Sequence, residues 1–390
     1  MFRSQVLAVL FIALATSSTA APLAWSYRTG NYSWAVAVSR DGRYVVCGSD
    51  DMHAYFFGTG SKGVPAWSYL SSGYVRHVAI SDDGSRVAIG DSDGNVFLFN
   101  PGSNGSPDWS YRSSSSISAL AVTGSGAILV AGDREGRLYA FATDSAHRMI
   151  WEDAIPGGVL ALSLSSALDL AVTGAKGGLY FFTQVPQGAM TWSYENSTTF
   201  PEVALDDRSS RVVVGGSNGD VHMISASGQL VARQHIGGAV SALSVAATGE
   251  LILAGSTNGR VSLYESRSEL REIGSLQNAK PITAVALDDD GDIMAYADLD
   301  GSVSMYRNSL REQAWTFGTG AIVHSLSMSG NGLVMAASSD NGSVYLFDEE
   351  VQKKASGVTL DILFAPVIIA ACAFLYLLWR KRTKTHGKTL

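Results

Sequence analysis

The chain has 390 residues, 46% of them hydrophobic and 16% charged, so it can bury a core and is not a disordered chain. Residues 21–357 carry 22 basic and 34 acidic residues, and this net charge of −12 argues against nucleic-acid binding through phosphate neutralisation. The two cysteines, Cys47 and Cys372, lie in a predicted strand and in an apolar tail segment, which excludes a disulfide framework.

The first 20 residues have the pattern of a secretory signal peptide. Arg3 precedes an apolar run over residues 6–15, and small residues at Ser18 and Ala20 suit cleavage after Ala20. An uncleaved anchor is the alternative, but a run of this length is too short to span a bilayer comfortably. We therefore predict a signal peptide over 1–20.

A repeated unit follows, and residues 66–100 show it best. Four runs rich in Val, Ile, Phe and Tyr are separated by turn signals, among them Asp83-Gly84 and Asp93-Gly94. Such runs suit strands, and Asp-Gly supplies the positive φ angles of a tight hairpin. The unit is predicted to be a four-stranded antiparallel meander.

The unit recurs eight times with a spacing of 40 to 42 residues. One column, aligned four residues before the last hairpin turn, consists of Gly48, Gly90, Gly132, Gly174, Gly215, Gly255, Ala297 and Ser338. A second column, ten residues before a fixed position in the following strand, consists of Trp25, Trp67, Trp109, Trp151, Trp192 and Trp315. Eight units of this period are typical of propeller blades.

The two ends of the repeat region fit each other. Residues 23–27 form an outer-strand sequence with no blade before it, and the last unit, which ends near Phe347, lacks its outer strand. Pairing the two removes open sheet edges. The predicted fold is all-β: an eight-bladed β-propeller over 21–350, closed by an N-terminal outer strand.

The units resemble two related propeller families. The Gly-to-Trp-Ser-Tyr runs over 60–69 and 102–111 resemble PQQ-like repeats, and the Asp-Gly-x-Val-x-Leu-Phe run over 93–99 resembles WD-repeat blades. In the PQQ-like family, outer-strand Trp residues dock adjacent blades, which implies this role for the Trp column. The adjacent-cysteine pair of the PQQ dehydrogenases is missing and no Ca²⁺–quinone cluster is recognisable, so no quinone or other cofactor is expected. The bacterial outer-membrane assembly lipoprotein is similar in plan and acts as a scaffold.

The C-terminal end has the pattern of a membrane anchor. After a linker over 351–357, residues 358–379 form an apolar segment of about 33 Å as a helix, enough to cross a bilayer core of about 30 Å. The tail over 380–390 is basic, so the positive-inside rule predicts that it is cytoplasmic. The predicted location is the cell membrane, with a single span and the propeller outside.

Departures from the repeat mark the candidate ligand or partner site. His77 and Glu202 break a column of Ala and Ser on the inner strands, and the preceding column holds Trp34, Arg76 and His324 in its first, second and eighth units. If the ring closes, Trp34, Arg76, His77 and His324 cluster at the entry of the central channel. The alternative is that each is an individually satisfied polar residue between blades.

Other residues carry weaker signals. Asn31, Asn196 and Asn341 head possible glycosylation sequons, as does Asn104, although Pro107 follows the latter closely. The sequence has no nucleophile elbow, phosphate loop or metal-ligand spacing, so we expect no catalytic or metal-binding residues.

These observations predict a non-catalytic, extracytoplasmic binding or scaffold propeller. Its expected partners are a protein or a surface glycan, besides the lipid bilayer through the single span, with no nucleic acid and no small-molecule substrate. The alternative is an enzyme that uses the propeller channel, such as a quinoprotein-like oxidoreductase, because unrelated functions share this fold.

Overall fold

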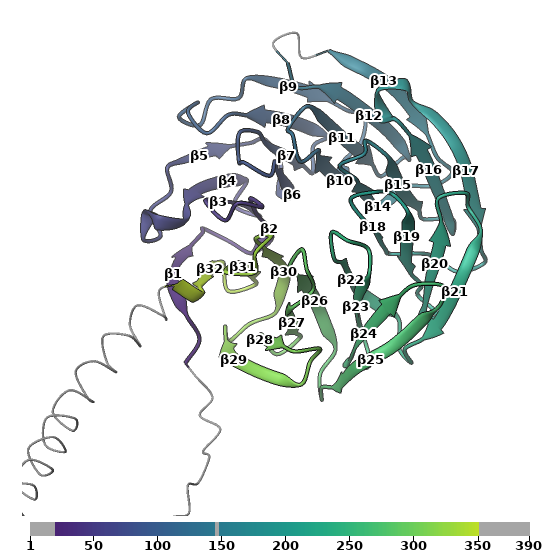
Figure 1. The fold of residues 1–390 in the computed structure, drawn as a ribbon. Coiled ribbons are helices and arrows are strands. Elements are labelled where there is room, and N and C mark those ends of the chain that lie inside the picture. Colours follow the sequence, from purple (N-terminus) through teal and green to yellow (C-terminus); the bar gives the residue numbers. More distant parts are fainter. Residues whose placement is uncertain (1–19, 145–147, 351–390) are drawn as a thin grey trace, which may run out of the picture.

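The computed structural model describes residues 20–144 and 148–350, which form a ring of eight four-stranded antiparallel sheets around a central channel (Figure 1). The predicted eight-bladed propeller is confirmed. Four predicted segments lie outside the described residues: residues 1–19 of the signal peptide, the linker over 351–357, the span over 358–379 and the tail over 380–390. Within the described ranges, no helix has the length and apolar character needed to cross a membrane.

Each blade runs from an inner strand at the channel to an outer strand at the rim. The strands of the first four blades are β2 (Ser33–Val38), β3 (Tyr44–Ser49), β4 (His53–Gly58) and β5 (Trp67–Leu70); β6 (Val75–Ile80), β7 (Val87–Asp91), β8 (Asn95–Phe99) and β9 (Trp109–Arg112); β10 (Ile117–Val122), β11 (Ile128–Asp133), β12 (Arg137–Ala142) and β13 (Met149–Ala154); β14 (Val159–Leu164), β15 (Leu170–Gly174), β16 (Gly178–Thr183) and β17 (Ala189–Glu195).

The remaining blades repeat this order, and the eighth takes its outer strand from the start of the chain. Their strands are β18 (Glu202–Leu205), β19 (Arg211–Gly215), β20 (Asp220–Ser225) and β21 (Leu230–His235); β22 (Val240–Val245), β23 (Leu251–Ser256), β24 (Arg260–Ser266) and β25 (Leu270–Gln277); β26 (Ile282–Leu287), β27 (Ile293–Asp298), β28 (Ser302–Arg307) and β29 (Glu312–Gly318); β30 (Val323–Met328), β31 (Val334–Ser339), β32 (Ser343–Asp348) and β1 (Leu23–Arg28). Two short 3₁₀ helices, η1 (Thr59–Ser61) and η2 (Val185–Gln187), lie between third and outer strands.

The N-terminal strand closes the ring. Strand β1 pairs antiparallel with β32, with Trp25 opposite Leu346 and Tyr27 opposite Val344. Trp25 also packs in a cluster with Val36 and Phe57 of the first blade. The same segment therefore completes the eighth sheet and docks it against the first blade.

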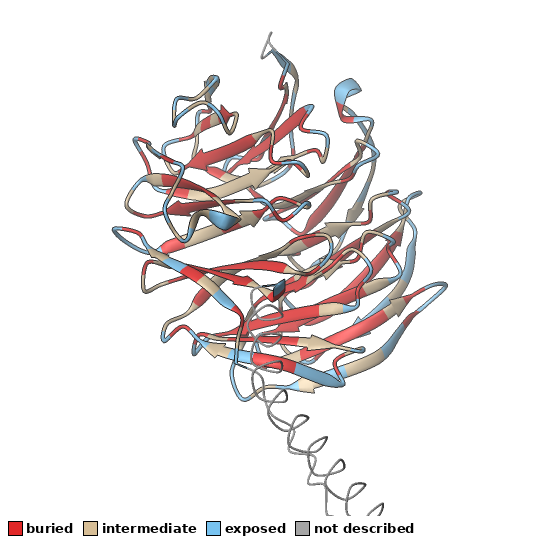
Figure 2. Ribbon diagram, turned by 60° about the vertical axis from the view of Figure 1, so that its left-hand side comes forward, coloured by how far each residue is buried: buried red, intermediate tan, exposed pale blue. Residues whose placement is uncertain are grey.

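The molecule has one apolar core at each interface between neighbouring blades instead of a single central core. Figure 2 shows the same division, with buried stretches running through the blades and exposed segments at their loops and rims. Between blades, serine hydroxyls on inner strands accept backbone N–H groups: Ser327 accepts from Val38 at 2.9 Å and Ser244 from Leu287 at 3.1 Å. Stability in such a ring depends mainly on contacts between neighbours.

The glycine column marks close contact between blades. A Cβ at Gly90 would lie 2.6 Å from the Ile117 side chain, and one at Gly132 would lie 2.7 Å from that of Val159.

In the fourth blade our alignment was wrong by one residue. Gly132 pairs with Ala119 in the third blade, and the residue that pairs with the equivalent Ala161 in the fourth blade is Thr173, not Gly174. The spacing from Gly132 to Thr173 is 41 residues, one fewer than the 42 that placed Gly174 in the column.

Candidate channel-mouth site

Three residues of the predicted cluster form a stack at the end of the channel where the inner strands begin, here called the channel mouth. Trp34 on β2 and His324 on β30 stack with ring centroids 4.0 Å apart and an interplanar angle of 24°. The guanidinium carbon of Arg76 on β6 lies 4.7 Å from the centre of the Trp34 ring. Because these strands belong to the first, eighth and second blades, ring closure brings the three side chains together. We call them the Trp–Arg–His stack.

Arg76 is held in place by a carboxylate of the neighbouring hairpin. Its Nε and Nη2 atoms donate to the two oxygens of Asp50, both at 2.9 Å. Asp50 has only 9% of its side chain exposed, against 36% for Arg76. Hydrogen bonding to Asp50 raises the pKa of Arg76 above its ordinary value, although desolvation opposes it. The bidentate geometry fixes the plane of the guanidinium over Trp34.

The ends of the stack are an exposed tyrosine and a paired histidine. The Arg76 guanidinium carbon lies 5.3 Å from the ring centre of Tyr74, which is 45% exposed. At the other end, His324 donates from Nε2 to the carboxylate of Asp340. The indole Nε1 of Trp34 is buried and has no hydrogen-bond partner among the described residues. The stack therefore offers an aromatic and cationic surface, and the unused Trp34 donor lies beneath it.

His77 lines the same region of the channel wall but does not join the stack. It makes no hydrogen bond or ring contact within the described part of the chain, and burial, with Arg134 and Arg76 nearby, lowers its pKa to about 4. Glu202 occupies the equivalent position in the fifth blade, and burial raises its pKa to about 8. Both side chains are therefore held in their neutral forms near neutral pH.

The opposite end of the channel is bridged by a network that the sequence did not reveal. Arg40, just after β2, contacts carboxylates of three other blades: Asp289 at 2.6 Å, Asp207 at 3.0 Å and Asp82 at 3.6 Å. Desolvation alone would lower the pKa of Arg40, but its hydrogen bonds to Asp289 and Asp207 raise it overall. We call these residues the Arg40 network.

The tryptophan column lies between blades. Five ring pairs each join an outer strand to the third strand of the next blade: Trp25 packs against Phe57, Trp67 against Phe99, Trp109 against Phe141, Trp151 against Phe182 and Trp315 against Phe347. Trp192 stacks on Phe181 of its own blade and donates from Nε1 to the Ala226 carbonyl of the next, at 2.9 Å.

The predicted glycosylation sequons differ in the hydrogen bonds that the side-chain amide of each Asn makes. Asn31 is exposed near the channel mouth, and its side-chain oxygen accepts the Tyr32 N–H at 2.8 Å. The side-chain nitrogen of Asn341 donates to the Thr319 carbonyl and the Tyr345 hydroxyl, at 2.9 and 2.8 Å. Asn196 lies after β17 and Asn104 is exposed. Glycosylation of these residues stays a prediction.

Sequence reasoning missed the partners that position the stack. Asp50 and Asp340 lie in the turns between second and third strands, and Tyr74 lies two residues before Arg76. Their positions in the repeat could have identified them, because the turns between second and third strands surround the channel mouth. Within residues 20–144 and 148–350, no group of three His, Cys, Asp or Glu side chains could hold a metal ion.

Solved structures with the same fold come from several sources. Sqt1 of Saccharomyces cerevisiae superposes with a TM-score of 0.74 at 12% identity, covering 85% of this chain and 99% of that one. Sqt1 of Chaetomium thermophilum, bound to the N-terminus of the ribosomal protein L10, gives 0.73 at 17% identity, covering 84% and 100%. The computationally designed Ika8 protein gives 0.72 at 18% identity, covering 84% and 99%. At these identities the likeness concerns the fold.

Two family models match the sequence itself. The WD domain, G-beta repeat, matches residues 27–57. The PQQ-like model described as outer membrane protein assembly factor BamB matches residues 81–355, which is more than half of the chain. Among curated proteins, none has a significant sequence match. The chain therefore belongs to the PQQ-like repeat family described as outer membrane protein assembly factor BamB.

Proposed function

We propose that this chain is a non-catalytic binding platform that holds a protein partner at the channel mouth. The observation that carries the proposal is the Trp–Arg–His stack, an aromatic and cationic surface whose geometry is set before any partner arrives. Trp, Tyr and Arg are the residue types that dominate binding energy at protein interfaces. A surface that is already ordered loses little conformational entropy on binding.

The polar side chains of the stack are held in place by carboxylates. Arg76 is paired with Asp50 and His324 with Asp340, so both side chains are positioned before a partner binds. At the opposite end, the Arg40 network spans the channel, which supports entry of a partner from the channel mouth.

The proposal includes a place in the cell. The signal-peptide pattern over 1–20 and the apolar segment over 358–379 support export of the propeller and its attachment to the membrane by one span. In this arrangement the platform presents a protein or surface glycan binding face outside the cytoplasm, close to the bilayer.

Site-specific photo-crosslinking in the source cells tests the proposal. A photoreactive residue replaces Tyr74, at the channel mouth, and in a control chain it replaces Val64, which is 66% exposed on the loop after η1. We expect a discrete crosslinked protein from position 74 that is absent from position 64 and lost in the Trp34→Ala background. The absence of such a product, together with a quinone bound to the purified chain, would support the enzyme alternative instead.

A further inference from the structure

One hydrogen bond recurs in the hairpin between the second and third strands of the blades. The backbone N–H of the first third-strand residue donates to a side-chain oxygen two or four residues earlier. The pairs are His53 to Asp51, Asn95 to Asp91, Arg137 to Asp133, Asp220 to Asn218, Arg260 to Asn258, Ser302 to Asp298 and Ser343 to Asn341. Seven of the eight hairpins, all of them within the described residues, thus contain an internal acceptor.

The fourth blade lacks this acceptor. Its third strand begins at Gly178, and the residues four and two positions earlier are Gly174 and Lys176, neither of which carries a side-chain oxygen. No side chain of the described residues accepts the Gly178 N–H group. The hairpin keeps its backbone bond from the Gly177 N–H to the Gly174 carbonyl, at 3.1 Å. The turn is therefore formed, but the oxygen that completes it in the other blades is missing.

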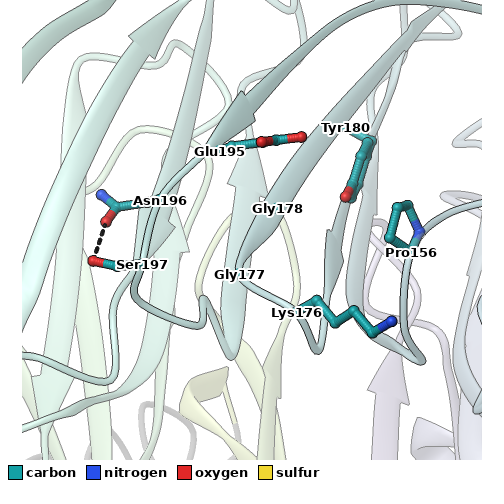
Figure 3. Close-up of a pocket in the computed structure, with 8 residues that line it drawn as sticks. All are labelled: Pro156, Lys176, Gly177, Gly178, Tyr180, Glu195, Asn196 and Ser197. Carbon is teal, nitrogen blue, oxygen red and sulfur yellow. Dashed lines mark hydrogen bonds between the residues drawn. The ribbon is translucent and has the colours of Figure 1, made fainter.

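A pocket of about 420 Å³ lies at this hairpin (Figure 3). Its walls come from Lys176 to Gly178 in the hairpin, from Tyr180 on β16, from Pro156 before the blade and from residues 195–197 after β17. Figure 3 shows the Tyr180 side chain standing between Gly178 and Pro156, with Lys176 below. The pocket thus borders the hairpin that lacks the acceptor.

Tyr180 is a largely buried side chain that lines the pocket, and its hydroxyl has no hydrogen-bond partner within the described residues. It occupies the same register as Tyr139 of the third blade, whose hydroxyl donates to the Asp133 carboxylate at 3.2 Å. Tyr180 is only 6% exposed, yet its hydroxyl makes no hydrogen bond within the described residues. Burial and the nearby Glu195 charge raise the pKa of Tyr180, so the hydroxyl keeps its proton and remains a donor. A ligand in the pocket can therefore accept a hydrogen bond from the Tyr180 hydroxyl.

We propose that this pocket binds a carboxylate group, which takes the place of the hairpin carboxylate that Asp133 supplies in the third blade. The incoming carboxylate accepts from the Tyr180 hydroxyl and the Gly178 N–H group, and the Lys176 ammonium neutralises its charge. Glu195 also lines the pocket, where it disfavours a second acidic group and accepts N–H or O–H donors from the rest of the ligand. A peptide C-terminus and a small free carboxylic acid both supply this chemistry.

The site is separate from the Trp–Arg–His stack. The stack belongs to the eighth, first and second blades, whereas the pocket belongs to the fourth blade and the connection from the third. Loss of partner binding in a Trp34 variant therefore leaves the carboxylate site intact. The two proposals can fail independently.

Ligand-observed NMR with the full-length chain tests the carboxylate directly. The probes are N-acetyl-glycylglycine, its C-terminal amide and acetate. We expect saturable binding of the acid and at least a tenfold weaker response to the amide, because only the acid presents a carboxylate. Binding of acetate as well assigns the site to small carboxylates, and binding of the peptide acid alone assigns it to a C-terminus. Equal binding of acid and amide, or no binding of any probe, overturns the proposal.

Three variants locate the binding. Lys176→Asn places an acceptor where Asn218, Asn258 and Asn341 supply it in other blades, and it should abolish acid binding while raising the unfolding midpoint by about 1–3 °C. Tyr180→Phe should abolish acid binding without lowering the midpoint, because the hydroxyl has no partner to lose. Glu135→Asn is the control, since it changes the equivalent hairpin position in the third blade, where Asp133 already accepts. Acid binding that survives both Lys176→Asn and Tyr180→Phe contradicts the assignment.

Discussion

At the scale of single residues, Glu202 and His77 place ionisable groups in a column of the inner strands that otherwise holds Ala and Ser. Glu202 has no charged partner that explains its raised pKa of about 8, which results from burial. Because the folded state holds this proton more tightly than the unfolded state, protonation of Glu202 stabilises the fold. That contribution is full below about pH 4.5 and is lost as the pH rises through about 8.

Substitution of Glu202 by Gln removes this dependence. Below about pH 4.5 the variant and the parent should unfold with similar free energies, and above about pH 8 the variant should be more stable by on the order of 3 kcal/mol. Urea denaturation at a series of pH values measures the difference, with Glu312→Gln, an exposed site, as the control. A difference that stays constant with pH would show that Glu202 is solvated in the folded protein.

Residue pairs were only partly predictable. Trp34, Arg76 and His324 stood out because they occupy the column before the one that His77 and Glu202 interrupt, and the repeat placed that column at one end of the channel. The Arg40 network could not be found in this way. Its members lie in turns of the first, second, fifth and seventh blades, and contact across the channel depends on the ring diameter and the reach of the arginine side chain, which no spacing in the sequence encodes.

At the scale of elements, ring closure through β1 has an energetic consequence. Trp25 is 7% exposed, its ring centroid lies 4.9 Å from that of Phe57, and its Nε1 donates to the Thr59 carbonyl at 2.9 Å. Trp192 makes the same kind of donation in the middle of the ring but is more exposed. We therefore expect the stability of the interface that closes the ring to depend more on Trp25 than the interface after the fourth blade depends on Trp192.

Truncation of these two tryptophans tests that comparison. Trp25→Ala should lower the free energy of unfolding by about 3–5 kcal/mol, the cost of removing a large buried aromatic side chain, and Trp192→Ala should cost clearly less. Equilibrium denaturation with urea measures both. Equal losses, or a larger loss for Trp192→Ala, would mean that the eighth blade is held mainly by the β1–β32 hydrogen bonds.

Element boundaries followed from the repeat with one exception. The strands of most blades lie where the columns predict, because alternating apolar runs and Asp-Gly turns define them locally. In the fourth blade the sequence TGAKGG over 173–178 offers several glycines, and only the observed pairing with Ala161 shows that Thr173, and not Gly174, occupies the column position. The same correction exposed the missing hairpin acceptor of this blade.

At the scale of the whole molecule, the membrane topology remains a prediction with a direct test. Cys47 is fully buried, and burial raises the pKa of its thiol to about 12, so it should react poorly with maleimides. A membrane-impermeant maleimide should label Val64→Cys on intact cells, whereas Lys388→Cys in the predicted tail should react only after lysis. The reverse pattern, or labelling of neither on intact cells, would contradict the proposed orientation.

The central claim is that the Trp–Arg–His stack carries partner binding, and an affinity series on the crosslinked partner tests it most directly. Arg43 is the matched control for Arg76, because it also pairs with an aspartate, Asp41, and lies 5.7 Å from a tyrosine ring centre, but near the opposite end of the channel. We predict that Trp34→Ala and Arg76→Gln each weaken binding of the full-length chain by about tenfold or more, as expected for hot-spot residues, and that Arg43→Gln leaves it unchanged. Equal affinities for the parent and all three variants would show that the partner binds elsewhere.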